Sequence, residues 1–164
     1  MFRYIKLFIR QPFTETSSKN DLDKIMSFIN TYKRHKLDVL PYKSVGESTD
    51  FKNIFENKTG IKFNPENFRN YRLDNIRKCN AMFIMRNNLS ESTAFELGHI
   101  YTKYPDLPIF FAIDNNCPIK TTLLQDLHPN VLYRHYNKPN DIKDDLYHWL
   151  DLIGETNFVL RDNR

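Results

Sequence analysis

Glycine and cysteine are both scarce in this sequence of 164 residues. Its 4 glycines are too widely spaced for the Gly-x-Gly-x-x-Gly fingerprint of dinucleotide-binding folds, and no Gly-x-x-x-x-Gly-Lys phosphate loop occurs. The 2 cysteines, Cys79 and Cys117, lie far apart and form no Cys-x-x-Cys motif. They indicate neither a redox pair nor a disulfide framework, and they favour a reducing compartment.

Long hydrophobic runs are missing as well. The apolar residues near the amino terminus are interrupted by Lys6 and Arg10, so this segment is too short and too charged for a signal peptide or a membrane span. We therefore expect a cytoplasmic protein that has no membrane partner.

Metal-site and serine-hydrolase patterns are also absent. The 5 histidines show no His-x-x-x-His spacing, and there is no Gly-x-Ser-x-Gly elbow. We predict no metal site and no cofactor.

The net charge of +4 would suit an acidic ligand, but the basic residues are dispersed. Their one cluster, Lys33 to Lys36, falls in the last turn of a predicted helix, where cations interact favourably with the helix dipole. Because no basic stripe with interleaved aromatic residues accompanies it, we expect no nucleic-acid partner.

What remains is the pattern of one α/β domain, predicted over residues 1–154, with a C-terminal tail over residues 155–164. Short apolar runs predict strands, and apolar residues repeated every three or four positions predict helices. The predicted strands are 4–9, 37–40, 82–85, 108–113 and 131–133, and the main predicted helices are 20–36, 64–79, 93–101 and 139–153.

Strands and helices alternate along the chain without a hairpin signal such as Asn-Gly between them. This order predicts a five-stranded parallel sheet with helices on both faces. Right-handed crossovers favour a flavodoxin-like or Rossmann-like strand order of 2-1-3-4-5. Ligands bind such sheets at the carboxyl edge where the strand order reverses, which here involves residues 11–16 and 86–93.

The connection over residues 41–63 has no sustained period and is long for a compact domain. Its aromatic residues suggest a short helix packed over the site. A binding loop and a surface excursion without function both remain open.

The loop over residues 86–92 is rich in polar residues and leads into a predicted helix at Thr93. The free N–H groups and the dipole of a helix start attract anions, so a phosphate would fit there. The spacing of Thr93 and Glu96 is also that of a capping box, in which both side chains bond to the helix backbone. On spacing alone, the capping role is the stronger interpretation.

Residues Ser90 to Gly98 read Ser-Glu-Ser-Thr-Ala-Phe-Glu-Leu-Gly. This segment resembles the signature of the nucleoside 2-deoxyribosyltransferase-like superfamily, in which a catalytic glutamate precedes an apolar residue and glycine. Segments 72–80, 121–123 and 130–132 are most similar to its subgroup of CMP and hydroxymethyl-CMP N-glycosidases, which are nucleotide hydrolases. The resemblance covers roughly residues 71–152 and makes catalysis the favoured role of Glu96.

The resemblance implies an enzyme that hydrolyses a pyrimidine nucleoside 5′-monophosphate, CMP or 5-hydroxymethyl-CMP, to the free base and ribose 5-phosphate. Glu96 would attack the anomeric carbon and form a glycosyl-enzyme intermediate. Two alternatives stay open. One is a nucleoside 2-deoxyribosyltransferase acting on free deoxynucleosides, and the other is a non-catalytic nucleotide-binding domain.

The sequence departs from the family pattern at the second acid. The family aspartate stands four residues before Ile76, where this sequence has Arg72. We predict the nearby Asp74 as the proton carrier, although residues two apart on a helix point about 200° away from each other. A solvated helix aspartate is the alternative for Asp74. The other acids considered are Glu15, Asp50 and Glu66.

Ser90 bears on the substrate. In the family, enzymes acting on free nucleosides tend to carry aspartate at this position, and enzymes acting on nucleotides carry serine. A carboxylate 4 Å from a phosphate charge is repelled by roughly 4 kcal/mol at an effective dielectric constant of 20. We therefore predict that Ser90, Ser92 and Thr93 bind a 5′-phosphate. Alternatively, the serines only cap the helix.

Further substrate-binding residues are Gln11 and Phe13, which match the family's Gly-Pro-Phe loop, and Arg86, which could reach a phosphate as Arg10 could. The phenylalanine would stack on the base or belong to the core. A polar segment after the fourth strand resembles one that reaches into a neighbouring subunit's site, which implies a homodimer or higher homo-oligomer. Its residues are Asn115, Asn116, Thr121 and Thr122.

Overall fold

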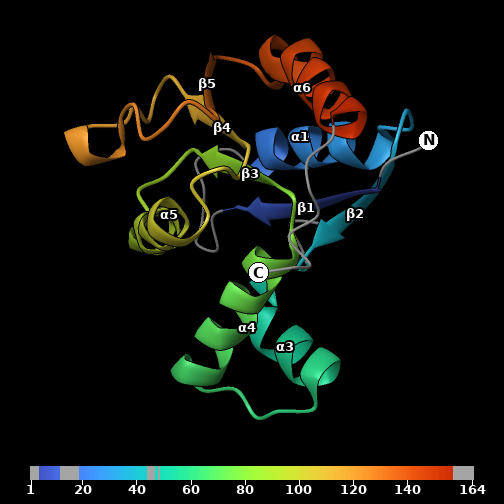
Figure 1. Cartoon of the computed structure of the whole chain (residues 1–164), viewed down its shortest axis with the longest axis vertical. Helices are drawn as coiled ribbons and strands as arrows, with labels where there is room; N and C mark the ends of the chain where they lie inside the picture. The colour runs from blue at the N-terminus through green and yellow to red at the C-terminus, as the bar shows by residue number, and fades with distance from the viewer. Residues whose placement is uncertain (1–3, 12–18, 44–46, 48, 157–164) are drawn as a thin grey trace.

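The computed structural model describes residues 4–11, 19–43, 47 and 49–156, and it shows a parallel five-stranded sheet (Figure 1). The strand order is β2-β1-β3-β4-β5, and all four neighbouring pairs are parallel, so the predicted α/β fold and strand order are confirmed. The strands are β1 (Tyr4–Arg10), β2 (Lys36–Leu40), β3 (Ala81–Arg86), β4 (Ile109–Asp114) and β5 (Val131–Tyr136).

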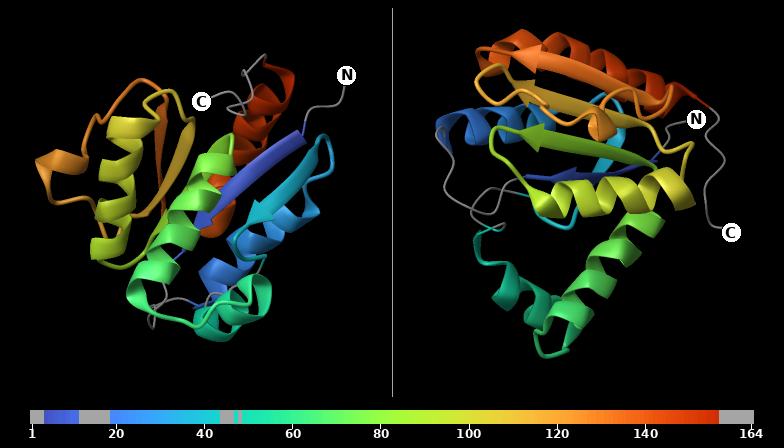
Figure 2. Two further views of the ribbon diagram at one scale, coloured as in Figure 1. Left: turned by 60° about the horizontal axis from the view of Figure 1, so that its bottom comes forward. Right: turned by 90° about the vertical axis from the view of Figure 1, so that its left-hand side faces the viewer.

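Helices cover both faces of this sheet (Figures 1 and 2). α1 and α6 lie on one face, and α4 and α5 lie on the other. The helices are α1 (Lys19–Thr31), α3 (Phe51–Thr59), α4 (Pro65–Lys78), α5 (Glu91–Lys103) and α6 (Lys143–Glu155), with short 3-10 turns η1 (Thr122–Leu124) and η2 (Pro139–Ile142).

The central strands β3 and β4 are buried along their whole length, which explains why they read as continuous apolar runs. Alternate side chains face opposite layers. Phe83 and Phe110 stack with their ring centroids 5.6 Å apart, and Trp149 of α6 packs edge-on against Phe110. Ile84 and Phe111 belong to the other core layer, which α4 and α5 cover.

The connection without a period contains α3, which forms an arm with α4 (Figure 1). Gly60 ends α3 in the left-handed region, at φ 70°. Asn64 then caps α4 and accepts a hydrogen bond from the Asn67 N–H, with proline at the first helical position. The arm is held by packed rings of Phe51, Phe55, Phe63, Phe68 and Tyr71.

Two expectations about segment ends change. α1 stops at Thr31, so the basic cluster over residues 33–36 lies in the turn to β2 and at the first residue of β2, and not in the last turn of a helix. α6 continues to Glu155, while residues 157–164, most of the expected tail, lie outside the described residues. Over the described part of the chain, no helix has the length and apolar character needed to cross a bilayer.

Candidate functional site

The start of α5 lies directly after the carboxyl end of β3, at the edge where the strand order reverses. α5 begins at Glu91, two residues earlier than the sequence predicts, and its N-cap is Ser90. The Ser90 Oγ accepts a hydrogen bond from the Thr93 N–H at 3.2 Å. The cap is therefore Ser90, and the capping box expected from the spacing of Thr93 and Glu96 does not form.

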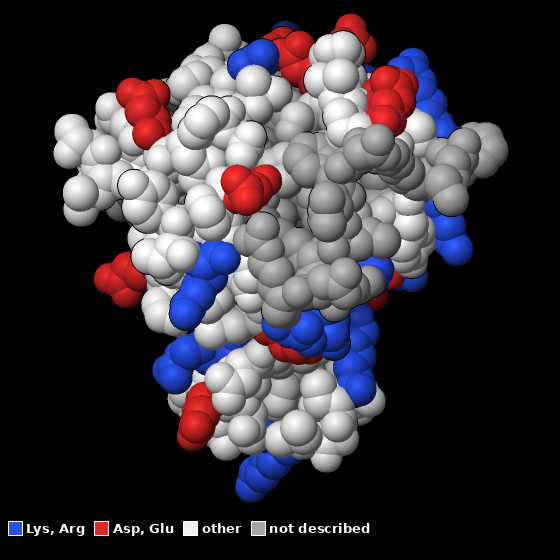
Figure 3. All heavy atoms as spheres, viewed as in Figure 1, with Lys and Arg blue, Asp and Glu red and all other residues white. Residues whose placement is uncertain are grey.

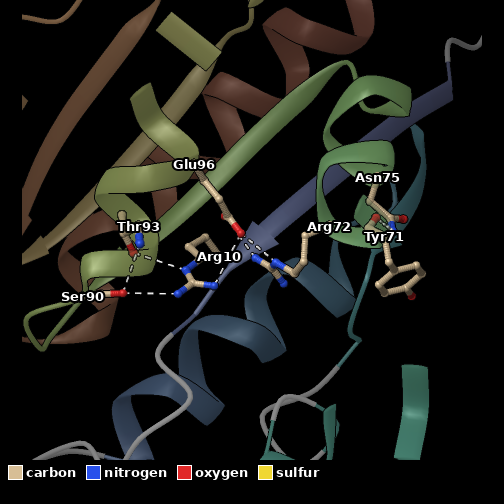
Figure 4. Close-up of polar contacts among 7 residues, drawn as sticks. All are labelled: Arg10, Tyr71, Arg72, Asn75, Ser90, Thr93 and Glu96. Carbon is tan, nitrogen blue, oxygen red and sulfur yellow. Dashed lines mark hydrogen bonds and ion pairs between the residues drawn. The ribbon is translucent and has the colours of Figure 1, made fainter. Parts of the chain in front are cut away.

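Glu96 lies one turn into α5, and its carboxylate points toward two arginines (Figure 4). The Nε of Arg72 donates to Glu96 Oε1 at 2.7 Å, and the Nη2 of Arg72 donates to Oε2 at 3.1 Å. The Nη1 of Arg10 lies 3.6 Å from Oε1. All three side chains are at most 5% exposed, so Glu96 is a buried carboxylate neutralised by a bidentate partner.

Arg10, at the end of β1, joins the carboxylate to the helix start. Its Nε donates to Thr93 Oγ1 and its Nη2 donates to Ser90 Oγ, both at 3.2 Å. Burial is the main cause that lowers the pKa of Arg10, to about 10, against the attraction of Glu96. The guanidinium therefore stays charged at neutral pH, beside both the hydroxyls and the carboxylate.

Arg72 projects from α4, and its guanidinium group is held by aromatic rings against its flat faces and by the Glu96 carboxylate at its edge. Its guanidinium carbon lies 4.7 Å from the ring centroid of Phe8 and 6.0 Å from that of Tyr42. Burial lowers the pKa of Arg72, but the attraction and hydrogen bonds of Glu96 outweigh burial and raise that pKa overall. Arg72 is a permanently charged group in a fixed orientation.

The three charged groups form the polar end of a cleft of about 520 Å³ between α5 and the α3–α4 arm. Its other walls are largely aromatic and aliphatic. Phe95 of α5 is 53% exposed and faces the rings of the arm. The cleft is lined by Arg10, Phe51, Phe63, Pro65, Phe68, Arg69, Arg72, Leu73, Glu91, Ser92, Phe95 and Glu96.

A second hollow of about 520 Å³ lies beside β2 and the end of α1. It is lined by surface lysines and by His35, and it brings no buried carboxylate together with hydroxyl groups. On the face seen in Figure 3, basic and acidic side chains are mixed over the surface. We therefore take the cleft that contains Glu96 as the candidate functional site.

Asp74, the predicted proton carrier, is not brought to Glu96. Its side chain is 42% exposed and pairs with Arg77 at 2.8 Å and Lys78 at 2.5 Å, and it is absent from the cleft lining. The adjacent Arg72 and Leu73 do line the cleft. Because residues two apart lie on nearly opposite sides of a helix, an inward Arg72 places Asp74 outward.

The other predicted residues divide between the cleft and its surroundings. Ser92 is exposed and lines the cleft, whereas Gln11 is buried and does not. Arg86 binds the carbonyl oxygens of Cys117 and Pro118, both at 3.0 Å, and so ties the end of β3 to the loop after β4. Phe13 lies outside the described residues, as Glu15 does.

Sequence reasoning missed the role of Arg72. It expected the aromatic residues over 41–63 to pack over the site, but it did not identify which rings line a cleft. Arg72 was noticed only as a departure from the expected acid, yet it is the main partner of Glu96. The aromatic wall from Phe51, Phe63 and Phe68 falls in and around the segment without a period. The high phenylalanine content of this segment was the available signal for an aromatic wall. Which of the rings face the cleft depends on how α3 packs against α4.

Comparison with solved structures gives a likeness over nearly the whole fold. This chain has the fold of a CMP N-glycosidase. One match is to the Clostridium botulinum CMP N-glycosidase BcmB, with a TM-score of 0.61 and 16% identity, over 88% of this chain and 98% of that chain. At this identity, the likeness concerns the fold. No protein-family model matches the sequence, and neither does any curated protein.

Proposed function

We propose that this protein is an N-glycosidase that hydrolyses a pyrimidine nucleoside 5′-monophosphate to the free base and a sugar 5-phosphate. One observation carries the proposal: a buried carboxylate, Glu96, lies one turn beyond a hydroxyl-bearing helix start and faces an aromatic cleft. A sugar phosphate placed at the helix start would present its anomeric carbon to that carboxylate. CMP and 5-hydroxymethyl-CMP are the first substrates to test, because the similar structure is a CMP N-glycosidase.

The environment of Glu96 suits a nucleophile. Arg72 holds the carboxylate in a fixed orientation, because Oε2 accepts one of the hydrogen bonds from Arg72 while Oε1 lies near both arginines. A carboxylate oxygen has two lone pairs, so Oε2 retains electron density for attack on the anomeric carbon. The resulting glycosyl ester would then be hydrolysed by water.

The hydroxyl groups suit a phosphate. Ser90 Oγ accepts hydrogen bonds from the Thr93 N–H and from Arg10, so its own proton is available to donate to an anion. Hydrogen bonds from a neutral donor to a charged group contribute about 1.5–3 kcal/mol. Ser92 in the first turn, the helix dipole and the charge of Arg10 act in the same direction.

Two observations favour other functions. Glu91 also lines the cleft and would repel a phosphate, which favours a 2-deoxyribosyltransferase that accepts uncharged nucleosides. The bidentate pairing of Glu96 with Arg72 occupies both carboxylate oxygens, which favours a domain that binds nucleotides without turnover.

One assay distinguishes the three functions. The protein is incubated with ribo- and deoxyribonucleoside 5′-monophosphates and with the free nucleosides, with and without an acceptor base, and released base is measured by chromatography. Release from monophosphates without an acceptor supports the proposal. Transfer that requires an acceptor supports the transferase, and binding without release supports the nucleotide-binding domain.

Glu96→Gln tests the nucleophile. Because the amide keeps the shape but loses the negative charge, we expect base release to fall at least about 1,000-fold, as for the loss of a covalent nucleophile. Asp74→Asn is the matched control on α4, and we expect it to retain at least about half of the parent rate, since its side chain points to solvent. An unimpaired Glu96→Gln variant would falsify the assignment, and an inactive Asp74→Asn variant would restore the prediction for Asp74.

A further inference from the structure

The cleft offers a cation where a glycosidase normally offers an acid to the departing group. Arg72 lines the cleft next to Glu96, is 4% exposed, and is held on both oxygens of Glu96 and against the ring of Phe8. Such a guanidinium cannot swing away, and its pKa stays high, so it does not give up a proton.

Among the described residues that line the cleft, Glu91 carries the only other carboxyl group. It lies exposed at the first position of α5, next to Ser90 at the proposed phosphate site. Asp50 accepts a hydrogen bond from Asn53, and Glu66 is exposed in the first turn of α4; neither lines the cleft. Among the described residues that line the cleft, the groups beside Glu96 are therefore the guanidinium groups of Arg72 and Arg10, and Arg10 also donates to Ser90 and Thr93.

This arrangement has a chemical consequence, and it rests on the proposed function. When Glu96 attacks the anomeric carbon, the bond from that carbon to the base nitrogen breaks, and its electron pair stays on the base. A proton donor would neutralise the base at that moment, whereas an arginine can only hydrogen-bond to it. The base then leaves as an anion stabilised by the positive charge.

We propose that Arg72 stabilises an anionic leaving base, and that the substrate is a monophosphate whose base spreads negative charge over two ring carbonyls, as uracil and 5-substituted uracils do. Cytosine, with an exocyclic amine in place of one carbonyl, forms the less stable anion and is the poorer leaving group at this site. Water then attacks the glycosyl ester and regenerates the Glu96 carboxylate. The proton lost by that water neutralises the base anion, so the reaction consumes one water and no other reactant.

The aromatic wall fits such a base. The phenylalanine rings of the arm and Phe95 provide stacking surface but no hydrogen-bonding groups. A base in this cleft is therefore bound by its flat faces, and its ring carbonyls are the groups that interact with the arginines.

The test is a leaving-group series. Base release is measured for the 5-fluorouracil, uracil and 5-methyluracil nucleoside monophosphates, in the sugar series that the first assay identifies, and for the cytosine compound. Electron withdrawal at position 5 stabilises the anion, so we expect kcat to fall in the order 5-fluoro, unsubstituted, 5-methyl, over about tenfold or more. We expect uracil to be released at least about tenfold faster than cytosine.

Arg72 variants separate this role from simple support of Glu96. Arg72→Gln should slow release of every base and make the dependence on the 5-substituent steeper, because the anion is no longer compensated. Arg72→Lys should recover part of the rate and of the parent dependence. A purely structural role would slow all substrates by one factor and leave the dependence unchanged, which would overturn the proposal.

Two further outcomes bear on it. A rate that is flat or reversed across the series, with activity that declines as a donor loses its proton at alkaline pH, would show that an acid protonates the base. Glu15→Gln tests the acid that lies outside the described residues, and full activity of that variant supports the role of Arg72. If no monophosphate releases its base, the proposed function itself fails; if bases are released in the wrong order, only this inference does.

Discussion

At the scale of single residues, the site depends on how three buried charges share their hydrogen bonds. Glu96 carries one negative charge, and Arg10 and Arg72 carry two positive charges within the same small volume. The excess positive charge at the end of an aromatic cleft suits an anionic substrate. It also accounts for the tolerance of Glu91 at the rim, where solvent screens its charge.

Ser90 has a double role that mutation can separate. Ser90→Ala removes the N-cap of α5, which should lower the free energy of unfolding by about 1 kcal/mol, measured by urea denaturation. It also removes a hydrogen-bond donor to the phosphate, so kcat/KM for the monophosphate should fall by about tenfold or more. Binding of ligands that carry no phosphate should not weaken in the same way.

Asn64→Ala is the control for this prediction. It removes the N-cap of α4, where Asn64 accepts from the Asn67 N–H at 2.8 Å, and should cost similar stability. We expect it to leave two quantities unchanged: the KM for monophosphates and the inhibition constant of inorganic phosphate. Equal effects of both variants on phosphate affinity would mean that Ser90 acts only as a cap.

At the scale of elements, the position of Arg72 follows from the packing of α4 against β1. The α4 face that carries Ile76 is buried, and Arg72, one turn earlier on the same face, reaches over Phe8 toward α5. The aperiodic segment was expected to hold a short helix over the site, and it does contain α3. The ends of α3 could not be predicted, because aromatic packing within the arm stabilises this helix, and its sequence has no sustained amphipathic repeat.

The contact between α6 and the segment that follows α1 gives a pH-dependent prediction. Asp151 of α6 accepts a hydrogen bond from the Tyr32 hydroxyl at 2.6 Å and pairs with Arg34. Partial burial raises the pKa of Asp151, but these two partners outweigh burial and lower that pKa below its ordinary value of 3.8. The carboxylate therefore stabilises the fold above pH 3.8, and this contribution is lost as the pH falls through the lowered pKa.

Asp151→Asn should accordingly lower the free energy of unfolding by about 1–2 kcal/mol at pH 7. The difference from the parent should shrink as the pH falls below 3.8, where the parent's carboxyl group takes up its proton. Asp145→Asn is the matched control, since its pair with Arg134 is about half exposed and should contribute less than about 1 kcal/mol. A gap for Asp151→Asn that is constant with pH would contradict the prediction.

At the scale of the whole molecule, the sequence predicts a homodimer through its resemblance to a family in which subunits share sites. The segment that carries this prediction includes η1, where Leu123 is 82% exposed, and Leu89, near the start of α5, is 68% exposed. Exposed leucines are suitable contacts for a second copy.

We therefore expect light scattering to give twice the chain mass of 19.7 kDa. Leu123→Asp should shift the protein toward the monomer, because a charge placed in an apolar interface opposes association. Leu152→Asp, at an exposed position of α6, is the control and should leave the mass unchanged. A parent protein that stays monomeric at concentrations well above those of the assay would contradict the expected dimer.

The sequence by itself determined the order of the elements, the parallel sheet and the edge at which the candidate site lies. Short apolar runs such as Met82 to Met85, which alternate with helical patterns along the chain, favour strands buried on both faces, and this apolar pattern is local information. The tertiary structure alone decided that Ser90 and not Thr93 caps α5, that Asp74 faces solvent, and that Arg72 binds Glu96. These outcomes depend on the rotation of α4 about its axis and on its distance from α5, which are set by close packing between residues far apart in the chain.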